Sequence, residues 1–144
     1  MTDRAVEIAE QRVRELLAQD AVARGLGVTV SRARPGEVAT HLIVSAEMLN
    51  GHGSAHASVL FALAAIAFAG ASNSHGEAAI GRSCAIDYLE PAFAGDALTA
   101  TAAERAREGR TGLYDVAVRR DGDGALIAEL RGVSRPLPQR RAAG

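Results

Sequence analysis

The polar residues best suited to chemistry lie in one short loop, which leads directly into the most apolar stretch of the chain. Asn50, His52 and His56 fall within residues 50–56, and residues 57–71 carry no charge and are mostly alanine and larger aliphatic or aromatic residues. A helix of this composition is expected to be buried on all sides. Its first backbone N–H groups have no partner within the helix. We therefore expect a polar ligand to bind where this helix begins, near His56 and Ala57.

The rest of the chain predicts an antiparallel sheet wrapped around this helix, which is an α+β fold. Residues 1–25, capped by Thr2 or Asp3, form an amphipathic helical cover. Turn residues separate runs that alternate between apolar and polar. These runs predict strands from residue 28 and over residues 37–44, 78–89, 97–104, 112–119 and 125–133, with Asp121–Gly124 as a hairpin turn. We expect one domain over residues 1–144, with a frayed tail at 136–144.

Composition narrows the classes of function. The 144 residues carry 16 basic and 17 acidic side chains, so no basic surface is available to bind nucleic acid. The apolar helix is shorter than the roughly 20 residues that a membrane span needs. The charged N-terminal segment does not resemble a secretory signal, so we expect a cytoplasmic protein. Cys84 has no cysteine to pair with and is expected to be a small buried residue.

Three stretches resemble one family. They are NGHGSAHASVLFALAAIAFAGASNS from Asn50, CAIDYLEPAFAGDALTATA from Cys84 and GLYDV from Gly112. Together they are similar to the phenylacetate-degradation branch of the hotdog-fold acyl-CoA thioesterases, over about residues 48–134. The resemblance implies a hotdog fold and activity on (hydroxy)phenylacetyl-CoA or medium acyl-CoA thioesters. It implies no cofactor besides the coenzyme A of the substrate.

The resemblance also implies a catalytic site. In the family, a backbone N–H at the start of the central helix holds the thioester carbonyl, helped by an upstream asparagine and histidine. The matching residues are Asn50, His56 and Ala57, and Ser58 replaces the second glycine of the family motif. The family's catalytic carboxylate falls at Ala65, and no acidic residue stands between Glu47 and Glu77. We therefore expect weak hydrolysis.

Three alternatives stay open for this site. His52, His56 or a carboxylate of a partner subunit would replace the missing base. The chain would otherwise be a non-catalytic acyl-CoA-binding sensor. A hydratase of the same fold is the third option, although its usual acid and histidine pair is not visible on the helix.

The expected substrate-binding residues lie after the central helix. By the resemblance, a polar contact of the family falls at Gly81, with Ser83 two residues further along on the same face of the strand. Arginine is well suited to the phosphates of coenzyme A, and the arginines proposed for them are Arg82, Arg107 and Arg110, with Arg105 nearby. Each of these is also readily explained as part of a solvated strand face.

The sequence also bears on metal binding and on the oligomeric state. His52 and His56 have a spacing that zinc uses, but no third ligand stands nearby, so we expect no metal. A helix this apolar needs more cover than one short sheet provides. We therefore expect a homodimer with a continuous sheet, assembled further into a homotetramer.

Overall fold

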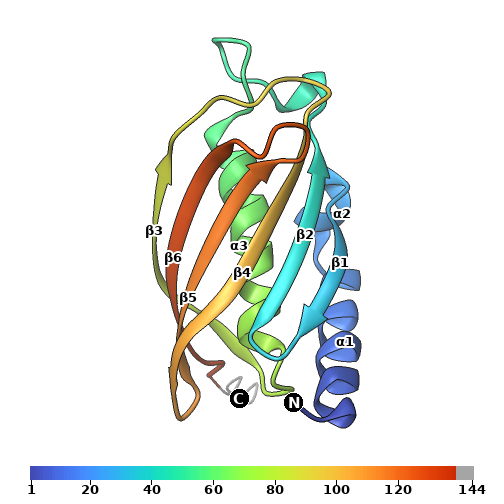
Figure 1. Cartoon of the computed structure of the whole chain (residues 1–144), viewed down its shortest axis with the longest axis vertical. Coiled ribbons are helices and arrows are strands. Elements are labelled where there is room, and N and C mark those ends of the chain that lie inside the picture. The colour runs from blue at the N-terminus through green and yellow to red at the C-terminus, as the bar shows by residue number, and fades with distance from the viewer. Residues whose placement is uncertain (139–144) are drawn as a thin grey trace, which may run out of the picture.

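The computed structural model describes residues 1–138 and contains one antiparallel sheet curled around helix α3 (Ala57–Asn73), as Figure 1 shows. The strand order is β1-β2-β4-β5-β6-β3. The strands are β1 (Thr29–Arg34), β2 (Glu37–Ile43), β3 (Ala79–Tyr88), β4 (Ala97–Glu108), β5 (Thr111–Arg120) and β6 (Leu126–Pro136). This arrangement confirms the predicted α+β class and the wrapping of the sheet around the apolar helix.

Two helices rather than one form the N-terminal cover. Helix α1 (Asp3–Ala18) begins as expected, since the Thr2 hydroxyl accepts a hydrogen bond from the Ala5 N–H at 3.1 Å. Helix α2 (Ala21–Leu26) ends at Gly27, whose left-handed backbone (φ 75°) favours glycine. Both helices contact α3, and α1 also runs along β1 (Figure 1). The cover therefore closes the β1 end of the sheet.

The sheet extends further at its C-terminal end than the sequence predicts. Strand β6 continues to Pro136, because Arg135 and Pro136 pair with Ile80 and Ala79 of β3. The prediction that fraying starts at residue 136 was therefore wrong at that residue. Residues 139–144 of the predicted tail lie outside the described residues.

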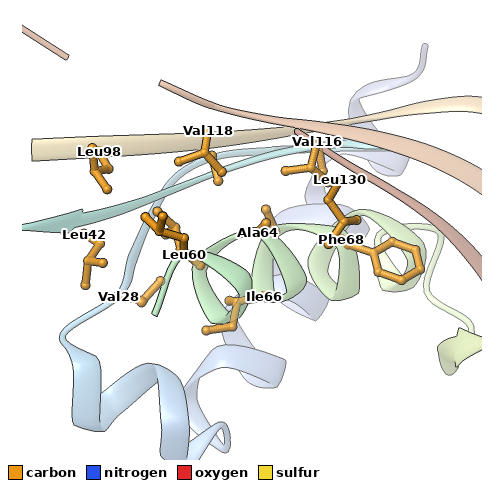
Figure 2. Packing of buried hydrophobic residues seen from close by; sticks show 14 of the residues in the cluster. Val28, Leu42, Leu60, Ala64, Ile66, Phe68, Leu98, Val116, Val118 and Leu130 are labelled. Carbon is orange, nitrogen blue, oxygen red and sulfur yellow. The ribbon is translucent and has the colours of Figure 1, made fainter. Parts of the chain in front are cut away.

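The core lies between α3 and the inner face of the sheet. Figure 2 shows Leu60, Ala64 and Phe68 on the side of α3 that faces the sheet, and Ile66 on the opposite side. Small residues allow this close approach: a Cβ atom on Gly70 would lie 3.0 Å from Val38 Cγ1. The ring of Phe68 lies over two strand glycines, Gly81 and Gly132. The position of α3 against the sheet therefore depends on these glycines, because a larger side chain at any of them would not fit.

Helix α3 is not buried on all sides, which corrects the prediction. One stripe is open: Ala57, Ser58 and Phe61 are exposed, and Ala62, Ala65 and Ala69 are partly exposed. Phe61 keeps 39% of its surface. The stripe stays open because six strands and two helices do not enclose the whole circumference of α3. No helix within residues 1–138 combines the length and hydropathy of a membrane span.

Cys84 is exposed, so the prediction of a buried cysteine was also wrong. The reason is topological: β3 is an edge strand and pairs only with β6. Packing around the sulfur atom still raises the pKa of the Cys84 thiol. The thiol is therefore not activated as a nucleophile.

Candidate active site

His56 forms the cap of α3 and leaves one amide free. Its backbone is extended (φ −60°, ψ 140°), and its Nδ1 accepts the Ser58 N–H at 3.0 Å. The N–H groups of Val59 and Leu60 donate to the His56 carbonyl at 3.0 and 3.3 Å. Among the residues that the structure describes, the Ala57 N–H has no hydrogen-bond partner. The helix start therefore offers one amide donor, at the residue named from the sequence.

The hydrogen bonds of His56 determine its tautomer. A ring nitrogen that accepts an amide N–H must carry a lone pair, so the proton of the neutral ring lies on Nε2. The Ser58 hydroxyl also approaches Nδ1, at 2.7 Å. His56 therefore presents an N–H donor to its surroundings, while its one basic nitrogen is occupied by the cap. This geometry suits a role in polarising a carbonyl better than the activation of water.

Asn50 organises the loop that precedes the cap. Its side-chain oxygen accepts the N–H groups of His52 (2.9 Å) and Ser54 (3.2 Å), and its amide donates to the Ser54 hydroxyl at 2.9 Å. His52 lies exposed in this loop. A pattern of bonds to the residues just ahead is an Asx-type turn. Asn50 thus fixes the loop that delivers His56 to the start of the helix.

Ala65 lies in the open stripe, midway between two points where α3 and β3 are joined. At one end the Tyr88 hydroxyl donates to the Ala57 carbonyl at 3.3 Å. At the other end the Asn73 amide donates to the Ala79 carbonyl at 2.9 Å. The methyl group of Ala65 supplies no acid or base there. Asp87, the acidic residue of β3, lines a hollow with Asp115 and Glu129 on the outer face of the sheet instead.

A groove of about 350 Å³ continues the open stripe toward the C-terminal end of α3. Ala69 and Asn73 line it on the helix side and Ala79 and Gly81 on the strand side. Asp20 is the carboxylate in its lining, and that carboxylate accepts the Ala23 N–H at 2.9 Å as the cap of α2. The groove is largely apolar, which suits an acyl chain better than a phosphate.

The arginines predicted for phosphate binding do not gather at the helix start. Arg110 lies at the β4–β5 hairpin, where it pairs with Glu77 at 2.6 Å and donates to the Ala78 carbonyl at 2.8 Å. Arg107 is exposed at the same hairpin, which lies at the opposite end of α3 from Ala57 (Figure 1). Arg82 and Ser83 are exposed on β3. The prediction that Ser83 shares a strand face with Gly81 was wrong, because a bulge between them pairs Gly81 with Ser134 and Ser83 with Val133. Within one chain, these residues are separate from His56 and Ala57.

Two contacts of the site were missed by sequence reasoning. Tyr88 reaches the first turn of α3, and Asp20 lines the groove beside Ala69. Neither had a local signal, because each comes into place only through the packing of an edge strand or a cover helix on α3. Among residues 1–138, no group of three or more His, Cys, Asp or Glu side chains is arranged to hold a metal ion.

Comparison with known proteins places this chain in a family. Residues 52–127 match the family model of the thioesterase superfamily. The chain is 44% identical to acyl-coenzyme A thioesterase PaaI of Escherichia coli (strain K12) over 110 residues, which are 76% of this chain and 79% of that protein. The structure of E. coli PaaI superposes with a TM-score of 0.90 at 40% identity, covering 93% of this chain and 96% of that one.

Two further solved structures extend the comparison. The TT0310 protein of Thermus thermophilus matches with a TM-score of 0.78 at 39% identity, over 83% of this chain and 99% of that one. The smu.793 protein of Streptococcus mutans UA159, solved with acetyl-CoA bound, shares the fold with a TM-score of 0.73 at 23% identity, over 79% and 91% of the two chains. The fold, the free amide at the start of α3 and these similarities lead to one conclusion: the chain belongs to the acyl-CoA thioesterases of the thioesterase superfamily and is PaaI-like.

Proposed function

We propose that this chain binds (hydroxy)phenylacetyl-CoA-like or medium acyl-CoA thioesters at the start of α3 and hydrolyses them weakly. The Ala57 N–H would hold the thioester carbonyl, with the His56 Nε2–H beside it as a second donor. Such donors stabilise the charge that develops on a carbonyl oxygen during attack. The acyl group would follow the open stripe of α3 past Ala65 into the groove at Ala69 and Gly81.

The observation that carries this proposal is the unpartnered Ala57 N–H beside an open, uncharged stripe. The same observation supports weak turnover, because Ala65 supplies no base and the Nδ1 of His56 is occupied by Ser58. General-base catalysis contributes about 10²–10⁴-fold. Loss of the carboxylate alone would therefore account for a slow enzyme that still binds its substrate.

We further propose that the site is completed in a homodimer, and that two dimers form a tetramer. Strand β3 is a free edge of ten residues, and the stripe of α3 lies next to it. A free edge of this length presents unpaired backbone N–H and C=O groups, which readily pair with another strand. A partner subunit would then cover Phe61 and Ala65 and bring its own arginines near the helix start. A cytoplasmic location is part of the same proposal.

The decisive test restores the carboxylate. The Ala65→Asp variant should hydrolyse phenylacetyl-CoA at least about 100-fold faster than the unchanged chain, because a base then faces the bound thioester. Ala62→Asp is the matched control, since it places the same group one turn earlier on the same stripe. Steady-state release of free thiol gives the rates. Equal rates for the Ala65→Asp variant and the unchanged chain would refute the proposed site.

A second function, a non-catalytic acyl-CoA sensor, is favoured by the same missing base. Titration calorimetry with a non-hydrolysable phenylacetyl-CoA analogue separates the two. Tight binding without measurable turnover by the unchanged chain would identify the sensor, whereas binding with slow turnover supports the weak enzyme. No binding would exclude both. Light scattering tests the assembly, and a monomer would contradict the shared site.

A further inference from the structure

Four side chains form a continuous hydrogen-bonded chain across the outer face of the sheet, away from α3. The Ser31 hydroxyl lies 2.5 Å from His41 Nε2. His41 Nδ1 lies 2.9 Å from the Thr99 hydroxyl, and that hydroxyl donates to Asp121 Oδ1 at 2.6 Å. The four residues come from β1, β2, β4 and the turn after β5. The proposed acyl-CoA site uses none of them.

The carboxylate at one end sets the direction of every bond in this chain. An ionised carboxylate only accepts hydrogen bonds, so the Thr99 hydroxyl donates its single proton to the hydrogen bond with Asp121. Thr99 must then accept from His41 Nδ1–H, which leaves the Nε2 lone pair facing Ser31. The Ser31 hydroxyl therefore donates to His41. A nucleophile that donates to a histidine, itself oriented by a third group, is the arrangement of an activated serine.

A β-bulge supplies the position of Ser31. Val30 pairs with Thr40 and Arg32 pairs with Ala39, so Ser31 is an extra residue in β1. Bulges bend a strand and redirect side chains, and they are frequent beside active sites. Here the bulge places Ser31 and Arg32 in succession on the outer face. Ser31 is exposed, so its hydroxyl is accessible to a ligand.

Ser31 also lines a groove of about 590 Å³ between α1 and β1. Three arginines line it with one acid, Glu10. Arg32 is paired with Glu37 at 3.2 Å, whereas Arg14 and Arg34 form no ion pair within residues 1–138. Leu17 and Val30 add apolar surface. This lining suits a small ligand with an apolar part and a negative charge.

We propose that Ser31 and His41 form a second, esterase-type catalytic site for small esters that carry a carboxylate. Ser31 Oγ bonds to the ester carbonyl carbon while its proton passes to His41 Nε2. The bond from that carbon to the alcohol oxygen then breaks, and the alcohol leaves with the proton from His41. Water hydrolyses the acyl-serine with the same base, which returns the proton to Ser31. The net reaction is ester plus water to acid plus alcohol.

Thr99 and Asp121 act as positioning residues, because they orient His41 and do not touch the ester. The charged groups around His41 Nε2 are those of the groove, and Arg14 and Arg34 would hold the carboxylate of the substrate. Arg14→Gln should therefore weaken the preference for a charged ester over a neutral one. The activity is independent of Ala57 and Ala65, which lie on the other side of the sheet.

A fluorophosphonate probe tests the nucleophile directly. Ser31 Oγ would bond to phosphorus, the P–F bond would break and fluoride would leave, with the serine proton taken up by His41. Peptide mass spectrometry should find the adduct on Ser31, and Ser31→Ala should abolish it. An adduct found only on another residue, or none at all, would overturn the proposal.

Hydrolysis of mono-4-nitrophenyl glutarate, a charged ester, tests the positioning residues Thr99 and Asp121. 4-Nitrophenyl butyrate serves as the neutral ester for comparison. Thr99→Val should lower the rate at least about tenfold, because it removes the acceptor that orients His41. Thr99→Ser should restore most of that rate. Thr101→Val is the matched control, since it removes a hydroxyl two residues along the same strand face, and it should leave the rate unchanged. Equal losses in Thr99→Val and Thr101→Val would also overturn the proposal.

Discussion

The two faces of the same sheet are built on different physical principles, and neighbouring residues of β6 illustrate the difference. Gly132 faces inward, where a Cβ atom would lie 2.8 Å from the Phe68 ring. Arg131 faces outward and holds Asp115 with two hydrogen bonds, at 2.8 and 3.0 Å. The inner face depends on the close packing of apolar groups, whereas the outer face carries polar groups that bond to one another in water.

Two histidines show how the faces differ in chemistry. His56, at the N-terminal end of α3, accepts the Ser58 N–H with its Nδ1 lone pair and keeps the Nε2–H as a donor. His41, on the outer face, donates from Nδ1 to Thr99 and keeps the Nε2 lone pair for Ser31. The same side chain is thus a cap in one place and a base in the other. The partner of each ring nitrogen, rather than the residue type, decides which.

The largest expected effect comes from removing the free amide on the inner side. Ala57→Pro, made in the Ala65→Asp background, should lower phenylacetyl-CoA hydrolysis by about 10²–10³-fold, the usual cost of one oxyanion donor. Proline is tolerated at the first helical position because the N–H there has no helical partner. His56 already has the extended backbone that precedes proline. Thiol-release kinetics and thermal unfolding give the two readouts.

Two controls make this prediction specific to the inner site. Ala57→Ser keeps the N–H and should keep the hydrolysis rate. Ester hydrolysis at Ser31 should be the same in Ala57→Pro as in its parent, because the outer chain of hydrogen bonds does not involve α3. A parallel loss of both activities would mean that the two sites are not independent.

Adding one methyl group to the inner face should cost folding free energy. Gly132→Ala places a Cβ atom 2.8 Å from Phe68, and the ring has little room to move because a Cβ atom on Gly81 would also lie only 3.1 Å from it. Overpacking of this kind costs about 1–3 kcal/mol. The free energy of unfolding, from urea titration, measures the loss. Gly122→Ala in the β5–β6 turn is the control, because a Cβ atom there has no neighbour within 4 Å.

The inner face was largely predictable from the sequence. The apolar run over residues 57–71 predicts a helix. In the structure this helix begins at Ala57 and ends at Asn73, two residues beyond the run. The cap at Thr2 and the turn at Asp121 are local signals, and both were confirmed. The position of Ala65 within α3 also follows from sequence, because residues of one helix keep a fixed spacing. The open stripe did not follow, since exposure depends on how many strands surround the helix.

The outer face was not predictable, and its contacts show why. The bonded pairs Ser31 and His41, His41 and Thr99, and Thr99 and Asp121 are 10, 58 and 22 positions apart. Their meeting depends on the register of three strands and on one bulge in β1. A shift of one residue would send each side chain to the other face. No feature of the sequence near His41 therefore indicates these partners.

The smallest expected effect comes from the outer ion pair. Asp115 bonds to Arg131, and this hydrogen bond is the main reason that its pKa is lowered from the ordinary 3.8; the charge of Arg105 contributes less. Because both partners are open to solvent, Asp115→Asn should cost only about 0.2–1 kcal/mol at neutral pH. Urea unfolding of the variant and the unchanged chain measures the difference.

The pH dependence of that difference has a definite sign. A carboxylate with a lowered folded pKa contributes stability well above pH 3.8 and loses it as the pH falls through the folded value. The two chains should therefore converge in stability as the pH drops below 3.8. Added salt should reduce the difference at neutral pH, because exposed pairs are screened. If Asp115→Asn costs more than Gly132→Ala, polar bonding rather than packing dominates this part of the sheet, and the contrast between its faces fails.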